Sequence, residues 1–266
     1  MKNNISYSII NRDYIQKLWY INNYKYSIFI SNMVGQLFGL YNLDLNNTQF
    51  PEEKSNLNNA INNLNTYGYY VFNKKLDLSK CLSIKNHVMN KNFKPYKIKT
   101  NLIKGSHFID KQININNRCT LWINDQKDIY DIIHVKELAY DPLLLNMVQS
   151  YLGCKPILCQ TNLWYTCCGN VEKTQLFHQD YDDINFLKVF VYLSDVSPNN
   201  GPHRYIKGSL NNIIVPPDYK PSTRLTSEFV DSVYKNNIIE YVGSTGTIIV
   251  ENTNGFHSGS TVKKGN

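Results

Sequence analysis

The sequence predicts a mainly β core with a helical N-terminal half packed on it. Before residue 153, apolar residues recur at helical spacing in several stretches that begin or end at proline and glycine. After Gly153 the chain consists of short β-rich runs separated by Gly, Pro and Asn, which is typical of an all-β sandwich or barrel. We expect a helical extension over residues 1–65 and a core domain over residues 66–266, together forming one compact unit.

The helices of the first half are predicted from apolar spacing and from residues that start or stop a helix. Residues 7–40 repeat apolar side chains at near-helical spacing. Pro51 opens a second helix because proline fits the first turn, and Gly68 ends it. Ser79 is expected to cap a third helix that runs to about Met89.

The next helical stretch is VKELAYDPLLLNMVQSYLG, residues 135–153, which predicts two helices separated near Pro142 and a stop at Gly153. Residues 91–128 are rich in loop-forming residues, with RCTLWI as a candidate strand. An earlier strand is expected at YYVF, residues 69–72. The strands of the core are expected in the runs ILCQTNLWYTC, FLKVFVYLSD, RYIKGS, NIIVP, IIEYVG and GTIIVEN.

Composition excludes several classes of function. The net charge is +7, but the lysines are scattered, so we expect no nucleic-acid partner and a mild preference for a small anionic substrate. Without an apolar run of about 18 residues we expect no membrane span. The six cysteines form no C-x-x-C pair, and the first residues lack a signal peptide's apolar segment. These features favour free thiols and a cytoplasmic location.

One short motif carries metal chemistry. His178 and Asp180 are two residues apart, so in an extended chain their side chains point to the same face. With one further histidine they make three ligands and leave three positions open on an octahedral metal, as in non-haem Fe(II) oxygenases. His-x-Asp also occurs by chance in solvated turns, so the triplet alone leaves both interpretations open.

His257 is the best candidate for the third ligand. It follows GTIIVENTNGF, a predicted buried strand that ends in the turn at Asn254 and Gly255. A position just past a late strand fits a ligand delivered by the same barrel, whereas a plain loop histidine is the alternative. The remaining histidines fall in predicted helices, loops or turns, at positions 87, 107, 134 and 203.

Two long segments resemble a known family. HQDYDDINFLKVFVYLSDVSPNNGPHRYIKGSL and GTIIVENTNGFHSGSTVKKGN resemble the phytanoyl-CoA dioxygenase family of Fe(II)/2-oxoglutarate-dependent oxygenases. LNTYGYYVF resembles the N-terminal strand of that family, and AYDPLLLNMVQSYLG resembles the helix before its core. The resemblance covers residues from about Leu64 to Asn266 and leaves the first 60 or so unexplained.

The resemblance implies a double-stranded β-helix (a jelly roll, cupin-like) with Fe(II) at one mouth. His178, Asp180 and His257 match the iron ligands of the family. The implied cofactors are Fe(II) and 2-oxoglutarate, with O₂ as the oxidant and ascorbate as an optional reductant. Related halogenases have a small residue in place of the aspartate, so Asp180 favours hydroxylation of a small-molecule substrate coupled to decarboxylation of 2-oxoglutarate to succinate.

The family also places an arginine about ten residues after the distal histidine, where its planar guanidinium grips the far carboxylate of 2-oxoglutarate. VKKGN resembles the turn before that arginine, and an arginine at about position 267 or 268 would favour the enzyme over a binding protein. None of the four arginines in the sequence stands at the matching place: they are Arg12, Arg118, Arg204 and Arg224.

Four other residues are candidates for cosubstrate binding. Lys188 is in step with Phe190, so an inward lysine would meet a carboxylate, although an outward lysine is as consistent with the pattern. Gln160 and Asn162 alternate on a predicted strand and either line the pocket or face solvent. Ser260 lies close enough to the distal histidine to hydrogen-bond the cosubstrate.

Two other functions remain open from the sequence alone. A cupin-like metal protein would use the same ligands for different chemistry. A non-catalytic binding member of the family would lack the residue that binds the far carboxylate of 2-oxoglutarate. The identity of the substrate and the oligomeric state do not follow from the residues.

Overall fold

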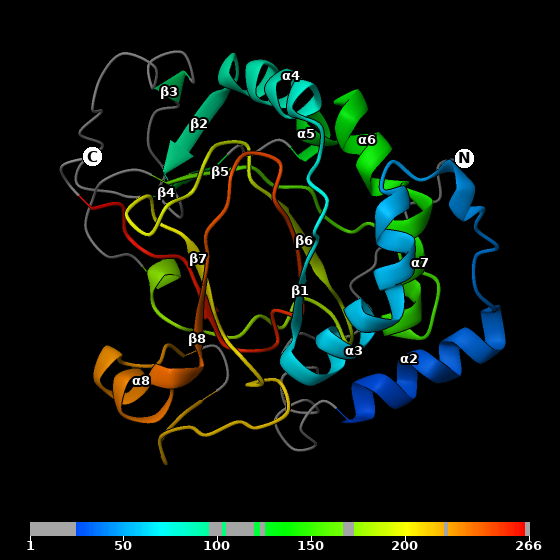
Figure 1. Ribbon diagram of the computed structural model, residues 1–266. Helices are drawn as coiled ribbons and strands as arrows, with labels where there is room; N and C mark the ends of the chain where they lie inside the picture. The colour runs from blue at the N-terminus through cyan, green and yellow to red at the C-terminus, as the bar shows by residue number, and fades with distance from the viewer. Residues whose placement is uncertain are drawn as a thin grey trace, which may run out of the picture.

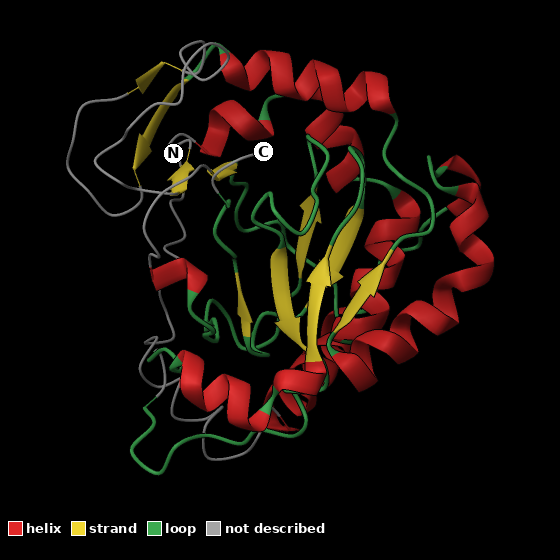
Figure 2. Cartoon of the chain, turned by 60° about the vertical axis from the view of Figure 1, so that its left-hand side comes forward, coloured by secondary structure: helices red, strands yellow, loops and turns green. Residues whose placement is uncertain are grey.

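The computed structural model of the chain describes residues 25–95, 103–104, 120–122, 126–166, 173–220 and 223–263. In this part of the chain, antiparallel strands form the centre of the molecule, and most helices cover one side of them (Figure 1). A second view shows the strands enclosed between helical segments (Figure 2). The architecture is therefore mixed, with helices packed on antiparallel sheets.

The first helical segments begin and end where local signals predict. Helix α2 (Lys25–Phe38) lies within the helix predicted for residues 7–40, whose first part falls outside the described residues. A 3₁₀ turn η2 (Pro51–Asn56) leads into α3 (Leu57–Tyr67). Gly68 ends α3 in the left-handed region with φ 90°, which glycine adopts without a Cβ clash. The proline start and glycine stop are confirmed.

Asp77 and Asp141 cap the helices that begin at Leu78 and Pro142. Helix α4 (Leu78–Met89) begins after Asp77, whose carboxylate accepts from the amide of Ser79 at 2.8 Å. The cap is thus two residues earlier than predicted, because the aspartate holds the N-cap position. Helices α6 (Ile133–Ala139) and α7 (Pro142–Leu152) form the predicted pair, and Gly153 ends α7. The other short helical segments are η1 (Leu45–Asn47), α5 (Gln126–Tyr130), η4 (Lys173–Gln175), α8 (Ser227–Val233) and η5 (Lys235–Asn237).

Two three-stranded antiparallel sheets form the centre. The first has the order β1-β9-β6, with β1 at Tyr69–Val71, β9 at Ile248–Glu251 and β6 at Lys188–Val191. The second has the order β10-β7-β8, with β10 at His257–Ser258, β7 at His203–Ile206 and β8 at Ile238–Tyr241. Both sheets pair segments that lie far apart in the sequence, so tertiary packing and not local propensity sets their register.

The two sheets face each other across an aromatic interior. Tyr69 on β1 packs against Tyr205 on β7 and Tyr241 on β8, with ring centroids 5.8 and 5.3 Å apart. Phe190 on β6 lies 4.7 Å from the ring of His203 on β7. Because strand residues alternate between faces, the neighbours of these side chains point outward. The interior between the sheets is therefore distinct from the outer cores.

Each sheet is covered on its outer face. Ile248 and Val250 of β9 pack with Leu64 of α3 and Met147 of α7 in the largest apolar cluster. Ile206 of β7 packs in a second cluster with residues of α8 and with Phe177, Tyr219 and Phe256. The described residues thus form a helix–sheet–sheet–helix arrangement. Helix α3 shares its apolar cluster with β1 and β9, so packing is continuous across residues 65 and 66. The division of the chain into an extension and a core domain at this point stays a prediction.

A third hydrogen-bonded sheet has the order β3-β2-β4-β5, and Tyr165 on its strand β5 packs against the largest apolar cluster. Its strands are β3 (Ile103–Lys104), β2 (Asn92–Pro95), β4 (Thr120–Trp122) and β5 (Trp164–Thr166). The strand predicted in RCTLWI is confirmed, while ILCQTNLWYTC contributes only its last residues. The strand predicted in NIIVP is wrong: those residues form no strand, and Pro216 and Pro217 offer no N–H to a sheet.

Within the described ranges, no helix has the length and apolar character needed to cross a bilayer.

Candidate metal centre

Two histidines and one aspartate converge at the end of the second sheet. They are His178, Asp180 and His257, and their three ligand atoms all lie within 4.8 Å of one another. Both histidines are buried, with 8% and 5% of their surfaces exposed, and the aspartate is partly buried. Among the residues that the structure describes, no other group of three such side chains converges in this way. The three residues predicted as ligands are therefore spatial neighbours.

A backbone bridge holds the two imidazoles side by side. His178 and His257 exchange hydrogen bonds in an antiparallel bridge, with N···O distances of 3.0 and 2.9 Å. Residues paired in this way place their side chains on the same face. Their ring centroids lie 4.4 Å apart, and the ring of His203 lies 5.7 Å from that of His257. Both imidazoles therefore face the interior between the sheets.

The turn before His257 positions the aspartate. The amide of Asp180 donates to the carbonyl of Thr253 at 2.8 Å, and the Asn254 side chain donates to the Asp180 carbonyl at 2.8 Å. Gln179 points away from the cluster and donates to the Asn254 carbonyl at 2.7 Å. His178 and Asp180 thus share one face, as the spacing of two predicts, although both precede strand β6 by several residues.

Both imidazoles direct the same nitrogen toward the carboxylate. Nδ1 of His178 lies 2.9 Å from the Leu176 carbonyl, and Nδ1 of His257 lies 3.1 Å from the Gly255 carbonyl. Because a carbonyl only accepts, each Nδ1 carries a proton, and Nε2 faces the cluster. Nε2 of His257 lies 3.1 Å from Oδ2 of Asp180, and Nε2 of His178 lies 3.8 Å from Oδ1. Backbone carbonyls thus fix the orientation of both rings. Histidines that bind a metal through one ring nitrogen commonly have such a hydrogen-bond partner at the other nitrogen.

Burial and nearby charges favour the protonation state that binds metal for two of the three residues, His178 and Asp180. Burial lowers the pKa of His178 to about 3, with further lowering by the nearby cations of His257 and Arg224. Burial opposes ionisation of Asp180, but His257 and Lys188 together hold its pKa well below the usual value. Burial likewise opposes protonation of His257, yet the Asp180 carboxylate outweighs it and raises the pKa. A metal ion bound there would replace that proton.

Lys188 enters the same site from strand β6. Its ammonium lies 2.5 Å from Oδ2 of Asp180 and 2.9 Å from Oδ2 of Asp182. In the β6–β9 register Lys188 stands opposite Glu251, so both residues lie on the interior face of the first sheet. Of the two orientations that the sequence leaves open, the structure has the inward one.

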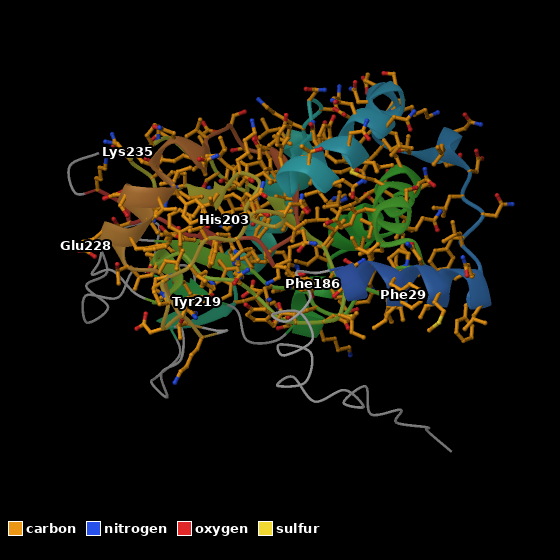
Figure 3. The ribbon with its side chains drawn as sticks, turned by 90° about the horizontal axis from the view of Figure 1, so that it is seen from below. Phe29, Phe186, His203, Tyr219, Glu228 and Lys235 are labelled. Atoms are coloured by element: carbon orange, nitrogen blue, oxygen red, sulfur yellow. The ribbon has the colours of Figure 1, made fainter. Side chains whose placement is uncertain are left out.

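A buried pair lies next to the ligands, and the sequence alone does not indicate that its two members meet. Nε2 of His203 is 3.0 Å from Oε1 of Glu251, whose side chain is fully buried. Oε2 of Glu251 and the hydroxyl of Tyr241 are buried without a hydrogen-bond partner among the described residues. Figure 3 places His203 in the middle of the molecule, far from Phe29 on α2. The signal for Glu251 was its position at the end of the apolar run TIIVE, where a carboxyl group needs a partner.

The other predicted cosubstrate residues lie away from the cluster or face solvent. Gln160 and Asn162 are exposed and precede strand β5. Ser260 is partly buried, and its hydroxyl donates to the carbonyl of Pro202 at 2.8 Å. Their role in binding a cosubstrate stays a prediction.

Comparison with known proteins gives matches only at the level of structure. No family model matches the sequence, and the search of curated proteins gives no match either. Among solved structures, the epimerase SnoN in complex with Fe³⁺, alpha ketoglutarate and nogalamycin RO matches with a TM-score of 0.54 and 14% identity. The match covers 79% of this chain and 79% of SnoN.

Two further matches are more distant. EctD from S. alaskensis with 2-oxoglutarate and 5-hydroxyectoine has a TM-score of 0.49 and 14% identity, covering 76% of this chain and 69% of EctD. HygX from Streptomyces hygroscopicus with nickel and 2-oxoglutarate has a TM-score of 0.46 and 17% identity, covering 77% of this chain and 80% of HygX. At these identities the SnoN match shows a shared fold, and the function must be argued from the site.

Proposed function

We propose that this protein is an Fe(II)/2-oxoglutarate-dependent oxygenase that oxidises a small molecule and resembles the phytanoyl-CoA dioxygenase family. The observation that carries the proposal is the convergence of His178, Asp180 and His257 with their ligand atoms within 4.8 Å. Two imidazoles and one carboxylate are the donor set of non-haem Fe(II) oxygenases. SnoN, whose fold this chain shares, was solved with Fe³⁺ and alpha ketoglutarate bound.

The cluster fits a metal ion of this kind. Adjacent ligands of an octahedral ion with bonds near ~2.1 Å stand about 3 Å apart. Nε2 of His257 lies 3.1 Å from Oδ2 of Asp180, close to that value, and Nε2 of His178 lies 3.8 Å from the other oxygen, Oδ1. Neutral imidazole and ionised carboxylate are also the protonation states that bind metal. Small side-chain adjustments would suffice to place all three atoms on one ion.

We further propose that the two facing sheets are the halves of a double-stranded β-helix. Two sheets of antiparallel strands, paired between distant segments and packed face to face, support this assignment. The His178 bridge adds a short fourth segment to the edge of the second sheet, beside β10. The metal cluster then lies at one mouth of the barrel.

Lys188 is the residue that we assign to the cosubstrate. Its ammonium already lies within the site, and a carboxylate ligand offers it the same interaction that Asp180 and Asp182 provide. Arg224 adds positive charge near His178. Gln160, Asn162 and Ser260 stay secondary candidates. The net charge of +7 supports a small anionic substrate, and a cytoplasmic location stays part of the proposal.

The residues of this chain would orient the reactants and exclude water, while the hard chemistry would belong to the cofactors. When bound, Fe(II) and 2-oxoglutarate supply the activation of O₂ that oxidises an unactivated C–H bond. Phe190 and Tyr241 pack against the ring of His203 in the interior, next to the buried Glu251 carboxylate. Asp180 is present where halogenases of the resembled family carry a small residue, which favours hydroxylation. SnoN is an epimerase, so the fold alone leaves the reaction type open.

The test is turnover of 2-oxoglutarate by protein reconstituted with Fe(II) under anaerobic conditions and then exposed to O₂. We expect slow release of succinate even without the substrate, and loss of that release in His257→Ala. Lys207→Gln, at an interaction with Tyr67 outside the cluster, serves as the matched control. A wild-type protein that binds iron but forms no succinate would refute the oxygenase and leave a cupin-like protein of other chemistry or a non-catalytic binding protein.

A further inference from the structure

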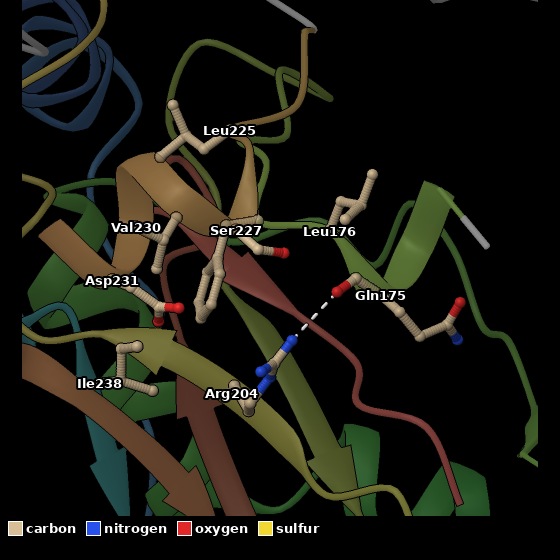
Figure 4. A pocket seen from close by; sticks show the side chains of 9 residues that line it. Gln175, Leu176, Arg204, Leu225, Ser227, Val230, Asp231 and Ile238 are labelled. Atoms are coloured by element: carbon tan, nitrogen blue, oxygen red, sulfur yellow. Dashed lines mark hydrogen bonds between the residues drawn. The ribbon is translucent and has the colours of Figure 1, made fainter. Parts of the chain in front are cut away.

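The outer side of the second sheet carries a polar arrangement directly behind the metal ligands. On β7, His203 and Tyr205 face the interior, so Arg204 between them points to the opposite face. Ser258 on β10 pairs with Arg204 in the sheet register and shares that outer face. Figure 4 shows the guanidinium of Arg204 directed toward Gln175.

The guanidinium joins three neighbouring segments of chain. Its Nε donates to the Ser258 hydroxyl at 3.2 Å, and its Nη2 donates to the carbonyls of Gly259 and Gln175 at 3.2 and 3.0 Å. Ser258 and Gly259 directly follow His257. Gln175 lies three residues before His178. One side chain of β7 therefore reaches across β10 to the segment that carries the other imidazole.

The surroundings hold this side chain in place. The guanidinium carbon lies 4.9 Å from the centroid of the Phe177 ring, a cation–π contact next to His178. The donors of a guanidinium diverge in a rigid plane, so one group can serve a hydroxyl and two carbonyls at once. The single ammonium of lysine has no such fork.

We propose that Arg204 is a positioning residue for the metal centre, which sets the spacing of His178 and His257 from behind the sheet. Backbone hydrogen bonds join the two ligand segments at the His178–His257 bridge and between Gly259 and Thr174, and Arg204 adds side-chain hydrogen bonds to both of these segments. The inference rests on the proposed function, because the spacing matters only where both imidazoles bind one ion. Changes to groups that orient metal ligands commonly weaken metal affinity by about 10–100-fold.

The experiment compares Arg204→Lys, Ser258→Ala and the control Lys207→Gln with the wild type. Affinity for Mn(II) is measured by calorimetry without O₂, and the visible absorption of bound Co(II) reports the ligand geometry. We expect Arg204→Lys to bind Mn(II) about 10-fold or more weakly with a changed Co(II) spectrum. Ser258→Ala should show a smaller loss in the same direction, and Lys207→Gln should match the wild type.

Thermal unfolding of the metal-free proteins separates positioning from general stability. The thermal data give the fraction of Arg204→Lys that is unfolded at the temperature of the calorimetry. We expect the loss of Mn(II) affinity to be far larger than that unfolded fraction would cause. Equal Mn(II) affinity and equal Co(II) spectra in the wild type, Arg204→Lys and Ser258→Ala would overturn the inference and leave the proposed function standing. A wild type that binds neither metal would overturn both. If Arg204→Lys does not fold, Ser258→Ala decides by the same two measurements.

Discussion

Replacing Lys188 by methionine should change the affinities for metal and for 2-oxoglutarate in opposite directions. The ammonium lies 2.5 Å from Oδ2 of Asp180, the same oxygen that lies 3.1 Å from Nε2 of His257. A metal ion and the ammonium are both cations that seek this oxygen, so the lysine competes with the metal. A carboxylate cosubstrate, in contrast, gains from the same ammonium.

The magnitude follows from the geometry of the pair. A hydrogen bond between charged groups contributes about 1.5–3 kcal/mol. The Lys188 and Asp180 side chains are 33% and 20% exposed, which weakens the pair by solvent screening. Lys188 also keeps Asp182 at 2.9 Å when Asp180 is taken by a metal. We therefore take about 1.4 kcal/mol, which is tenfold in an equilibrium constant.

Lys188→Met should consequently bind Mn(II) about tenfold more tightly and 2-oxoglutarate about 10–100-fold more weakly. The metal-free variant should unfold about 3–5 °C lower, since Asp180 loses a partner. Anaerobic calorimetry measures both affinities in sequence, with Lys207→Met as the charge-matched control. Unchanged or weaker metal binding would refute the competition, and unchanged 2-oxoglutarate binding would refute the cosubstrate role of Lys188.

Four more outcomes follow from the same site and its supports. At a metal concentration of 100 times Kd the wild type should gain about 2.7 kcal/mol of stability, and His257→Ala should show no metal-dependent rise in Tm. His203→Phe should lower the free energy of unfolding, measured in urea, by about 3 kcal/mol, because it leaves the buried Glu251 carboxylate without its partner. Adding Glu251→Leu should restore most of this stability, and an unchanged urea midpoint in His203→Phe would contradict the prediction. Gly68→Ala should lower Tm more than Gly208→Ala, since both glycines have positive φ but only the first lacks room for a Cβ; equal losses would contradict it. 2-Oxoglutarate should bind by calorimetry only after a divalent metal is added, and binding without metal would contradict the proposed site.

The ends of helices were predictable from the sequence because each depends on one or two residues. Proline at the start of a helix and glycine just past its end act through their own backbone, so Pro51, Gly68 and Gly153 needed no tertiary information. The cap of α4 was misplaced because Asp77 and Ser79 both have capping side chains, and only the structure shows which carboxylate or hydroxyl accepts the amide.

Strand pairing was not predictable in the same way. Strand β1 pairs with β9, so Tyr70 meets Val250 across most of the length of the chain, and no local signal encodes that partner. NIIVP has the β-branched composition of a strand, yet its side chains find no sheet to join, and Ile214 is 54% exposed. β-propensity describes fitness for a pleated, half-buried surface, and it does not supply the neighbour.

In the candidate site, too, local features were predictable from the sequence and contacts between distant segments were not. The spacing of His178 and Asp180 predicts a shared face, and the late strand before His257 suggested the third member, as the resemblance to the family also implied. The pair of His203 and Glu251 was missed because its two members are neighbours only through the packing of β7 against β9. A buried carboxyl group at the end of an apolar run predicts that a partner exists, but not which one.

The charges around the metal-ligand cluster support the proposed function. Asp180 and Asp182 both face Lys188, so two carboxylates share one ammonium before any ligand is considered. A dicarboxylate such as 2-oxoglutarate would meet a site in which Lys188 is already engaged. A divalent ion held by Asp180 neutralises that carboxylate and leaves Asp182 as the remaining protein partner of the ammonium. Metal binding would therefore add positive charge to the site and release Lys188 from Asp180, and both changes favour a dicarboxylate, with Lys188 as the group that changes partners.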